Sequence, residues 1–280
     1  MKRLGTGVES GHQEAEATGI MEHHRPANDA ATRAFTLREL VVVIAVLSVL
    51  GGTLLAALQQ RASWQIKKTQ CAANLRQFAL ATQLYATENC DKLPEISTGA
   101  WAWDFPGYAA DAFLQFGMDK RTFYCPGTAP RFNDNYNFLN SEPNSLWNFW
   151  GPELHIIGYS VAFNASPLAL SNRNTTILPE PIKINANIFP APPNHERVLL
   201  SDATISSSLS GTAANPAPAG SFTSVTGGFS VNGTHIPHLS PHLKGNLPAG
   251  GNLAFKDGHV AWRKFAQMQQ RAERNWGFWW

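Results

Sequence analysis

Residues 40 to 58 read Leu-Val-Val-Val-Ile-Ala-Val-Leu-Ser-Val-Leu-Gly-Gly-Thr-Leu-Leu-Ala-Ala-Leu, nineteen consecutive residues without a charge. As an α-helix this run spans about 28 Å, which matches the hydrocarbon core of a bilayer. Helices of globular proteins rarely stay apolar on every face over this length. A secretory signal peptide is the main alternative, but its apolar region should end at a small-x-small site, and this run ends at Leu58. We therefore predict a transmembrane helix over residues 35–60.

The helical pattern continues beyond the apolar run. Between residues 61 and 88, apolar or small side chains recur in steps of four and three, which places them on one face of a helix. They are Cys71, Leu75, Phe78, Thr82 and Tyr85. Because no proline occurs between residues 35 and 93, the sequence predicts a single helix from Leu37 to Asn89 that ends before Pro94.

The rest of the chain contains short strand-like pieces separated by turn residues. The predicted strands are Thr122–Cys125, His155–Phe163, Arg197–Ser201, Asn252–Phe255 and His259–Phe265. Lys256-Asp257-Gly258 between the last two is a hairpin signal, because Asp-Gly accepts the positive φ of a tight turn. Residues 164–194 and 203–250 are rich in Pro, Asn, Ser and Gly and are predicted to be surface loops. The expected fold is α+β, a long N-terminal helix packed on an antiparallel sheet, with residues 61–280 forming an exported globular domain.

Composition narrows the class of protein. Hydrophobic residues make up 44% of the chain and charged residues only 15%, which favours a membrane-linked or exported product. The net charge is +2, and no basic stripe is interleaved with aromatic residues, so we expect no nucleic-acid partner. Residues 1–34 are polar, without an apolar period, and are predicted to be a leader peptide. Either Met1 or Met21 can be the translation start.

The junction of leader and helix carries a motif. The run Ala34-Phe35-Thr36-Leu37-Arg38-Glu39, followed by the aliphatic stretch, resembles the prepilin-type cleavage and methylation signal of type IV pilins and type II secretion pseudopilins. The resemblance implies cleavage by a prepilin peptidase between Ala34 and Phe35 and methylation of the new amine of Phe35. It also implies that Glu39 guides assembly with other copies or other pilin-like subunits. The chain departs from the family pattern at Ala34, where glycine is usual, and at Arg38, where an apolar residue is usual.

A looser resemblance covers the domain. Several pieces are similar to a large pseudopilin-like group from planctomycete and verrucomicrobial-type bacteria, which implies a long N-terminal helix packed against an antiparallel sheet. These pieces are residues 71–80, 85–86, 93–94, 124–126, 158–160, 201–203 and 251–260.

Three cysteines are present, at positions 71, 90 and 125. None forms a Cys-x-x-Cys pair for zinc or redox chemistry. Cys71 and Cys90 on one helix would be about 28 Å apart, too far for a bond. We therefore predict a Cys71–Cys125 disulfide in the exported domain, where conditions are oxidising.

Four histidines near the C-terminus are the one cluster that resembles a catalytic or metal site. They are His235, His238, His242 and His259, with Asp202 and Asp257 as candidate companions. Their spacing fits no metal signature such as His-Glu-x-x-His, and no Gly-x-Ser-x-Gly nucleophile motif occurs. The turn explains Asp257 and the following strand explains His259, so we expect no catalytic residue, no metal site and no cofactor. Calcium held by loop oxygens is the alternative left open.

Nine tryptophans suggest a sugar-binding face as a further alternative. Trp101 and Trp103 alternate as they would on one strand face, where burial is the commoner fate. The tail Trp276-Gly277-Phe278-Trp279-Trp280 is too apolar for free exposure and is expected to dock on its own domain or on a neighbouring subunit.

Together these observations predict a non-enzymatic, single-pass protein of the inner membrane with an extracytoplasmic C-terminal domain. The favoured function is a minor pilin or pseudopilin, a structural subunit of a secretion or surface-fibre apparatus. The alternative is a membrane-tethered binding module that uses the prepilin export route, with carbohydrate as its candidate ligand.

Overall fold

The structure is a computed structural model of the 280-residue chain. It describes residues 36–96, 101–163, 174–184, 187–207, 221–225, 229–273 and 277–280. The predicted leader lies outside the described residues, as do Ala34, Phe35 and parts of the predicted loops 164–194 and 203–250. The chain divides into two compact units, Met1–Thr53 and Leu54–Trp280.

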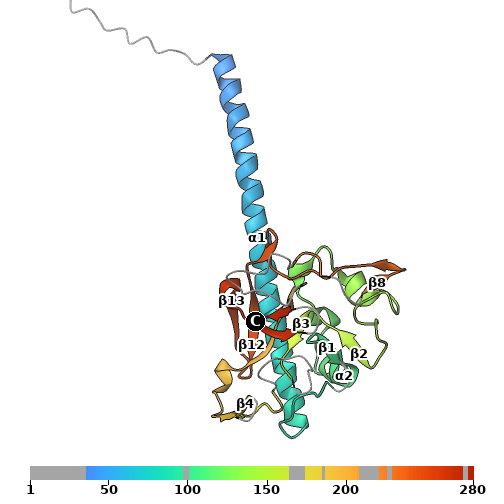
Figure 1. The fold of residues 1–280 in the computed structure, drawn as a ribbon. Coiled ribbons are helices and arrows are strands. Elements are labelled where there is room, and N and C mark those ends of the chain that lie inside the picture. The colour runs from blue at the N-terminus through green and yellow to red at the C-terminus, as the bar shows by residue number, and fades with distance from the viewer. Residues whose placement is uncertain are drawn as a thin grey trace, which may run out of the picture. The chain divides into compact units, whose positions relative to one another are not determined.

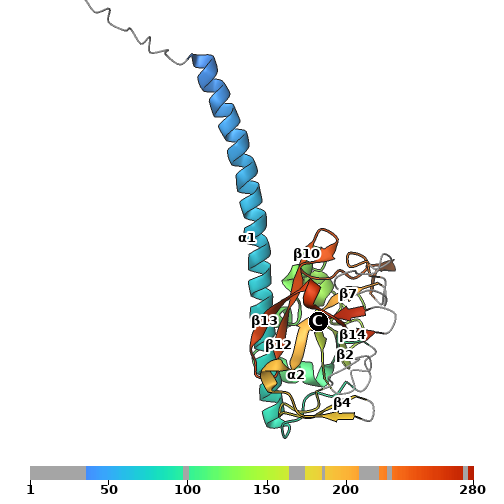
Figure 2. The same ribbon diagram turned by 60° about the vertical axis from the view of Figure 1, so that its left-hand side comes forward.

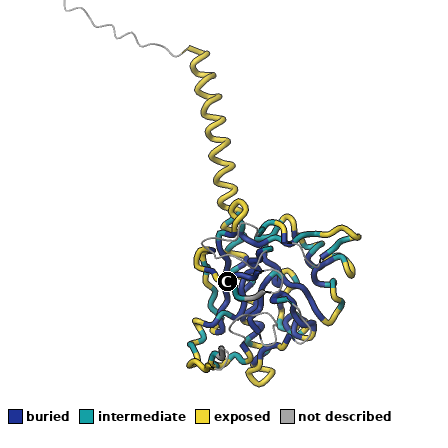
Figure 3. Tube along the Cα trace, in the orientation of Figure 1, coloured by how far each residue is buried: buried dark blue, intermediate teal, exposed yellow. Residues whose placement is uncertain are grey.

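One long helix, α1 (Leu37–Glu88), begins in the first unit and ends in the second, as predicted to within one residue. Its first part is apolar and exposed at every described position up to Thr53 (Figure 3). The side chains of Leu47 and Val49, for example, are 61% and 67% exposed. Among the described residues, α1 alone is long and apolar enough to cross a membrane, with a mean hydropathy of 2.6 over its best window.

Within the second unit, α1 becomes the helical layer of an α+β domain (Figure 1). Cys71, Leu75, Phe78 and Thr82 are buried and Tyr85 is half-buried, which confirms the predicted stripe. The helix ends where Cys90 and Asp91 adopt left-handed conformations, with φ of 55° and 61°. The amide of Asp91 donates to the Ala86 carbonyl at 2.7 Å and closes the last turn.

Antiparallel strands form the second layer. The main sheet has the order β13-β12-β6-β3, formed by Val260–Lys264, Gly250–Phe255, Val198–Asp202 and Tyr159–Val161. A three-stranded sheet has the order β14-β15-β7, formed by Gln270–Glu273, Gly277–Trp279 and Thr204–Ser206. The paired strands of the smaller sheets are β1 (Asp104–Pro106) with β2 (Leu154–Ile156), β4 (Ile182–Ile184) with β5 (Asn187–Phe189), β8 (Ser230–Val231) with β9 (Thr234–His235), and β10 (Leu243–Lys244) with β11 (Leu247–Pro248).

The second half of α1 runs beside the β12–β13 hairpin (Figure 2). The side-chain amide of Asn252 on β12 donates to the Lys68 carbonyl at 3.2 Å, and the side-chain amide of Gln83 donates to the Lys256 carbonyl at the hairpin turn, also at 3.2 Å. The turn itself is as predicted, since Gly258 has a φ of +88° and the His259 amide donates to Asp257 Oδ1. These bonds hold the sheet against the helix along most of its buried length.

An aromatic core lies under α1. Phe78 is fully buried, and its ring meets four other rings edge-on at 5.2 to 6.2 Å between centroids, namely those of Phe105, Phe113, Phe123 and Tyr159. Such edge-to-face pairs add to the free energy of plain burial. Phe113 belongs to a second helix, α2 (Gly107–Gln115), which the sequence patterns did not predict.

Two strand predictions need correction. Residues 122–125 are not a strand, because Asp119 accepts a hydrogen bond from the Arg121 amide and starts a 3₁₀-helix, Lys120–Phe123. The predicted strand 155–163 is divided into β2 and β3 around Gly158. A Cβ at Gly158 would lie 2.8 Å from the backbone nitrogen of Cys125, so this close approach requires glycine.

The C-terminal tail docks on its own domain. Strand β15 pairs with β7, and Trp279 donates through its indole nitrogen to Ser206 Oγ at 2.9 Å. Phe278, Trp279 and Trp280 are all buried, which confirms the docking prediction for this part of the tail; Trp276 lies outside the described residues.

Candidate functional site

Glu39, at the start of α1, is the residue of the predicted processing motif that has a proposed role and lies within the described part of the chain. Glu39 and Thr36 form a reciprocal cap, in which Glu39 Oε2 accepts from the Thr36 amide at 2.8 Å and from the Thr36 hydroxyl at 2.9 Å. The Glu39 amide in turn donates to Thr36 Oγ1 at 3.3 Å. This arrangement satisfies amides that the first turn of a helix leaves unpaired. The cleavage position, between Ala34 and Phe35, lies outside the described residues.

A second site lies in the interior of the domain and brings together four polar side chains from four elements. Cys71 comes from α1, Cys125 caps a 3₁₀-helix (Pro126–Thr128), Asp202 ends β6, and His242 precedes β10. All four are buried, and their sulfur, oxygen and nitrogen atoms all lie within 4.8 Å of one another. We call these four residues the buried cluster.

The contacts inside the buried cluster converge on its centre. The Cys71 thiol donates to Asp202 Oδ1 at 2.8 Å, and His242 Nε2 lies 3.3 Å from Cys125 Sγ and 3.4 Å from Asp202 Oδ2. Two backbone amides support the cluster from outside, since Asn252 donates to Asp202 Oδ2 at 2.7 Å and Gly127 donates to Cys125 Sγ at 3.4 Å.

Burial and mutual attraction set the charges of the buried cluster. Burial lowers the pKa of His242, but the Asp202 carboxylate outweighs burial and raises that pKa to about 10. Burial raises the pKa of Asp202, yet the charge of His242 and the hydrogen bonds from His242, Cys71 and Asn252 lower it on balance. Burial raises the pKa of the Cys125 thiol well above its usual range. Asp202 and His242 thus favour each other's charged forms, and burial favours the neutral form of the Cys125 thiol.

His242 is held in an unusual backbone conformation, with a φ of 55°. Its ring lies edge-on to Trp64 of α1 and Trp262 of β13, at 6.4 and 5.4 Å between centroids. Gly127 closes another side, because a Cβ there would lie 2.9 Å from the His242 backbone nitrogen and 3.0 Å from its ring. Packing thus fixes the direction of Nε2, while Nδ1 has no hydrogen-bond partner among the described residues.

The predicted Cys71–Cys125 disulfide is not formed. The structure brings the two residues into one cluster, but both thiols are free. In place of a bond between the two sulfurs, Cys71 faces the Asp202 carboxylate and Cys125 faces the His242 ring. Cys90, which we excluded as a partner, is exposed beyond the end of α1.

The remaining histidines do not join the buried cluster. His259 bonds to Asp257 at 2.6 Å in the hairpin turn, so both residues have the structural role expected of them. His238 is buried between Trp103 and Phe132, and His235 lies exposed on β9. The sequence patterns did not predict the contacts of His242, because the partners of this residue are far away in the sequence. Cys125 precedes it by 117 residues, and Cys71 precedes Asp202 by 131.

The tryptophans do not form an exposed platform among the described residues. Trp103, Trp147, Trp279 and Trp280 are buried, and Trp101 is half-buried. Trp150 is 55% exposed, and its ring packs edge-on against Phe149. Sugar stacking on several indoles at once finds no support here.

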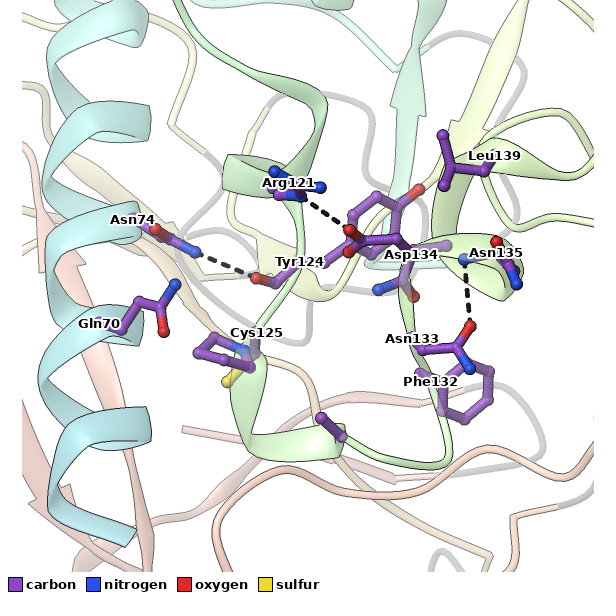
Figure 4. Close-up of a pocket in the computed structure, with 13 residues that line it drawn as sticks. Gln70, Asn74, Arg121, Tyr124, Cys125, Phe132, Asn133, Asp134, Asn135 and Leu139 are labelled. Carbon is purple, nitrogen blue, oxygen red and sulfur yellow. Dashed lines mark hydrogen bonds and ion pairs between the residues drawn. The ribbon is translucent and has the colours of Figure 1, made fainter. Parts of the chain in front are cut away.

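A cavity of about 530 Å³, lined by both polar and apolar side chains, opens beside the buried cluster (Figure 4). Gln70 and Asn74 of α1 form one wall, and Cys125 lies at its floor next to Tyr124. Asn74 donates to the Tyr124 carbonyl at 3.1 Å. On the far side, Arg121 pairs with Asp134 at 2.7 Å, and both side chains are substantially exposed to solvent.

Comparisons with protein-family models, with curated proteins and with solved structures found no match for this chain.

Proposed function

We propose that this protein is a prepilin-like subunit, anchored in the inner membrane by α1 and assembling through that helix with copies of itself or with other pilin-like subunits. Within that class, the favoured role is a minor pilin or pseudopilin of a secretion or surface-fibre apparatus. The domain serves as the extracytoplasmic, non-enzymatic part of the subunit.

One observation carries the proposal. A single unbroken helix of 52 residues is exposed and aliphatic in its first part and presents a buried stripe to its own domain in its last part. A soluble domain would not leave Leu47, Val49 and their neighbours in water, because exposed apolar surface of this extent marks contact with lipid or protein. The motif around Glu39 at the start of the same helix supports an assembly role over simple anchoring.

The Glu39 carboxylate supplies the assembly chemistry. Its cap with Thr36 is formed within one chain and lies at the surface. After cleavage, the amine of Phe35 in a neighbouring subunit can pair with Glu39, which relieves two charges that are costly beside lipid.

The test combines processing with self-association in the native cell. The membrane fraction is extracted and the protein's N-terminus is sequenced, while whole cells are crosslinked before extraction. The proposal predicts a start at Phe35 and a ladder of crosslinked species that contain this chain. A start near Leu58 would instead make the span an ordinary signal peptide, and an intact leader would show that the site is not cut.

The cavity beside the buried cluster favours one second candidate, a membrane-tethered binding module. The cavity offers amides, a carboxylate and a guanidinium, which are groups that orient polar ligands. Correct cleavage with a lone monomer after crosslinking would support the module over the subunit.

A further inference from the structure

We propose that Cys71, Cys125, Asp202 and His242 bind one zinc ion, which fastens α1 to the sheet of the domain. The inference is independent of the proposed assembly function, because it rests on the interior of the domain alone.

The geometry of the buried cluster suits a tetrahedral ion. Zinc bonds of about 2.0 to 2.3 Å place neighbouring ligand atoms about 3.3 to 3.8 Å apart. In the structure, His242 Nε2 lies 3.3 Å from Cys125 Sγ and 3.4 Å from Asp202 Oδ2. Cys71 Sγ lies closer than this to Asp202, at 2.8 Å, and no pair of ligand atoms exceeds 4.8 Å. Small side-chain rotations therefore convert the hydrogen-bonded cluster into a coordination shell.

The donor atoms select the metal. Two sulfurs, one imidazole nitrogen and one carboxylate oxygen are typical of zinc, which accepts soft and borderline ligands in a closed four-coordinate site. Calcium takes six to eight oxygen ligands, and the buried cluster offers the oxygens of one carboxylate. Calcium is therefore a poor fit at this position.

The orientation of His242 argues against a catalytic thiol. In a Cys–His–Asp relay, the sulfur and the carboxylate contact opposite ring nitrogens, so that the acid orients the base. Here Cys125 and Asp202 both face Nε2, and Nδ1 has no partner among the described residues. Ligands that point at one shared centre are what a bound cation requires.

The residues around the buried cluster hold its side chains in place, and a cavity beside it connects the cluster to solvent. The Gly127 amide donates to Cys125 Sγ, and the Asn252 amide donates to Asp202, so two dipoles stabilise the anionic forms of these ligands. The strained backbone at His242 is held by Trp64, Trp262 and Gly127, which fix the ring before any ion arrives. Cys125 also lines the cavity of Figure 4, which offers a route for the ion.

The thiols of Cys71 and Cys125 can either bind zinc or form a disulfide, but not both at once. Binding requires both sulfurs as thiolates, so it releases protons and depends on pH. An ion that holds both sulfurs blocks their oxidation. The experiment must therefore separate a zinc site from a Cys71–Cys125 bond.

The test uses the full chain extracted in detergent. Metal content is measured by mass spectrometry, and chelator-treated protein is then titrated with Co²⁺ as a coloured probe. We expect one equivalent of zinc in the purified protein and, on titration, visible bands of tetrahedral cobalt with a thiolate-to-cobalt charge-transfer band. Removing the metal should lower the melting temperature by about 5 °C or more, since a ligand at a hundred times its Kd contributes about 2.7 kcal/mol.

Variants provide the matched comparison. Cys125→Ser and Asp202→Asn each replace a ligand with a side chain of similar size, and should weaken cobalt binding at least about tenfold. Cys90→Ser and Asp257→Asn make the same two replacements outside the buried cluster and should leave binding unchanged. The cobalt spectrum of the unaltered chain decides the question if the ligand variants fail to fold.

Three results would overturn the proposal. They are the absence of thiolate-to-cobalt bands from the unaltered chain, equal binding by the ligand variants, and a Cys71–Cys125 linked peptide in the non-reduced digest of protein purified without chelator.

Discussion

The thiol of Cys71 on α1 donates a hydrogen bond of 2.8 Å to the carboxylate of Asp202 on β6, across 131 residues of sequence. Both side chains are buried, so the Cys71 thiol needs the carboxylate as its acceptor, while Asp202 also accepts from the Asn252 backbone amide. The bond fastens the N-terminal end of the buried helical stripe to the main sheet. It belongs to a cluster of four polar side chains in the interior of the domain.

Replacing Cys71 by alanine should destabilise the domain even without metal. In chelator, Cys71→Ala removes the donor to Asp202 and leaves a small cavity, at a cost of about 2 to 3 kcal/mol in the free energy of unfolding. Cys90→Ala is the control, because Cys90 is exposed and should change stability by less than about 0.5 kcal/mol. Urea unfolding of both variants measures the difference. Equal midpoints would show that the Cys71 contact contributes nothing to stability.

The aromatic core should depend on Phe78. Phe78→Ala removes the ring on which four others converge and should cost about 3 to 5 kcal/mol. Leu80→Ala, two residues away on the same helix, alters a side chain that is 55% exposed and should cost far less. Thermal unfolding followed by near-ultraviolet circular dichroism compares the two. Similar losses would mean that α1 does not dock as described.

Glu180 should be needed to keep two buried cations stable. It lies 3.4 Å from Arg197 and 3.5 Å from Lys256, whose side chains are almost fully buried. Burial lowers the pKa of Lys256, which Glu180 partly offsets. Glu180→Gln leaves both cations without their carboxylate and should cost about 3 to 5 kcal/mol. Glu153→Gln changes an exposed carboxylate and is the control; a loss no larger than that of the control would contradict the buried pairing.

His238 should make the domain sensitive to mild acid. Burial lowers the pKa of His238 to about 3, so the folded protein holds this ring neutral while the unfolded chain protonates it near its ordinary value. The unfolded state then binds more protons below about pH 6.5, and stability falls as the pH falls. Between pH 7 and pH 5 the loss contributed by His238 should be about 2 kcal/mol.

His238→Phe isolates this effect, because it keeps a ring against Trp103 and Phe132 but cannot titrate. The urea midpoint of the variant should change less between pH 7 and pH 5 than that of the unaltered chain. Parallel pH profiles for the two proteins would rule out a neutral, buried His238.

Glu39 should matter for assembly and not for cleavage. Glu39→Ala removes both the cap with Thr36 and the charge, whereas Glu39→Gln retains a capping side chain and removes only the charge. We expect both variants to start at Phe35 and both to lose the crosslinked ladder. Retention of the ladder by Glu39→Gln would assign Glu39 to helix capping, and loss of cleavage in either variant would contradict the separation of the two steps.

The sequence by itself determined the elements whose signals are local. The uninterrupted apolar run, the stripe from Cys71 to Tyr85 and the absence of proline specified α1 almost to the residue, because helical periodicity is carried by neighbours along the chain. The Asp257-Gly258 turn was equally readable, since its positive φ is a property of the glycine itself. The composition of the tail also predicted that it docks, because so apolar a segment is unstable in water.

Only the tertiary structure decided the buried cluster. Cys71, Cys125, Asp202 and His242 come from four elements, and no spacing rule connects them. Their meeting depends on Gly158 letting two backbone segments touch, on the 3₁₀-helix that replaced a predicted strand, and on the packing that orients His242. The Gly158 and His242 contacts join segments that are distant in the sequence, and their free energy exists only once the chain has folded.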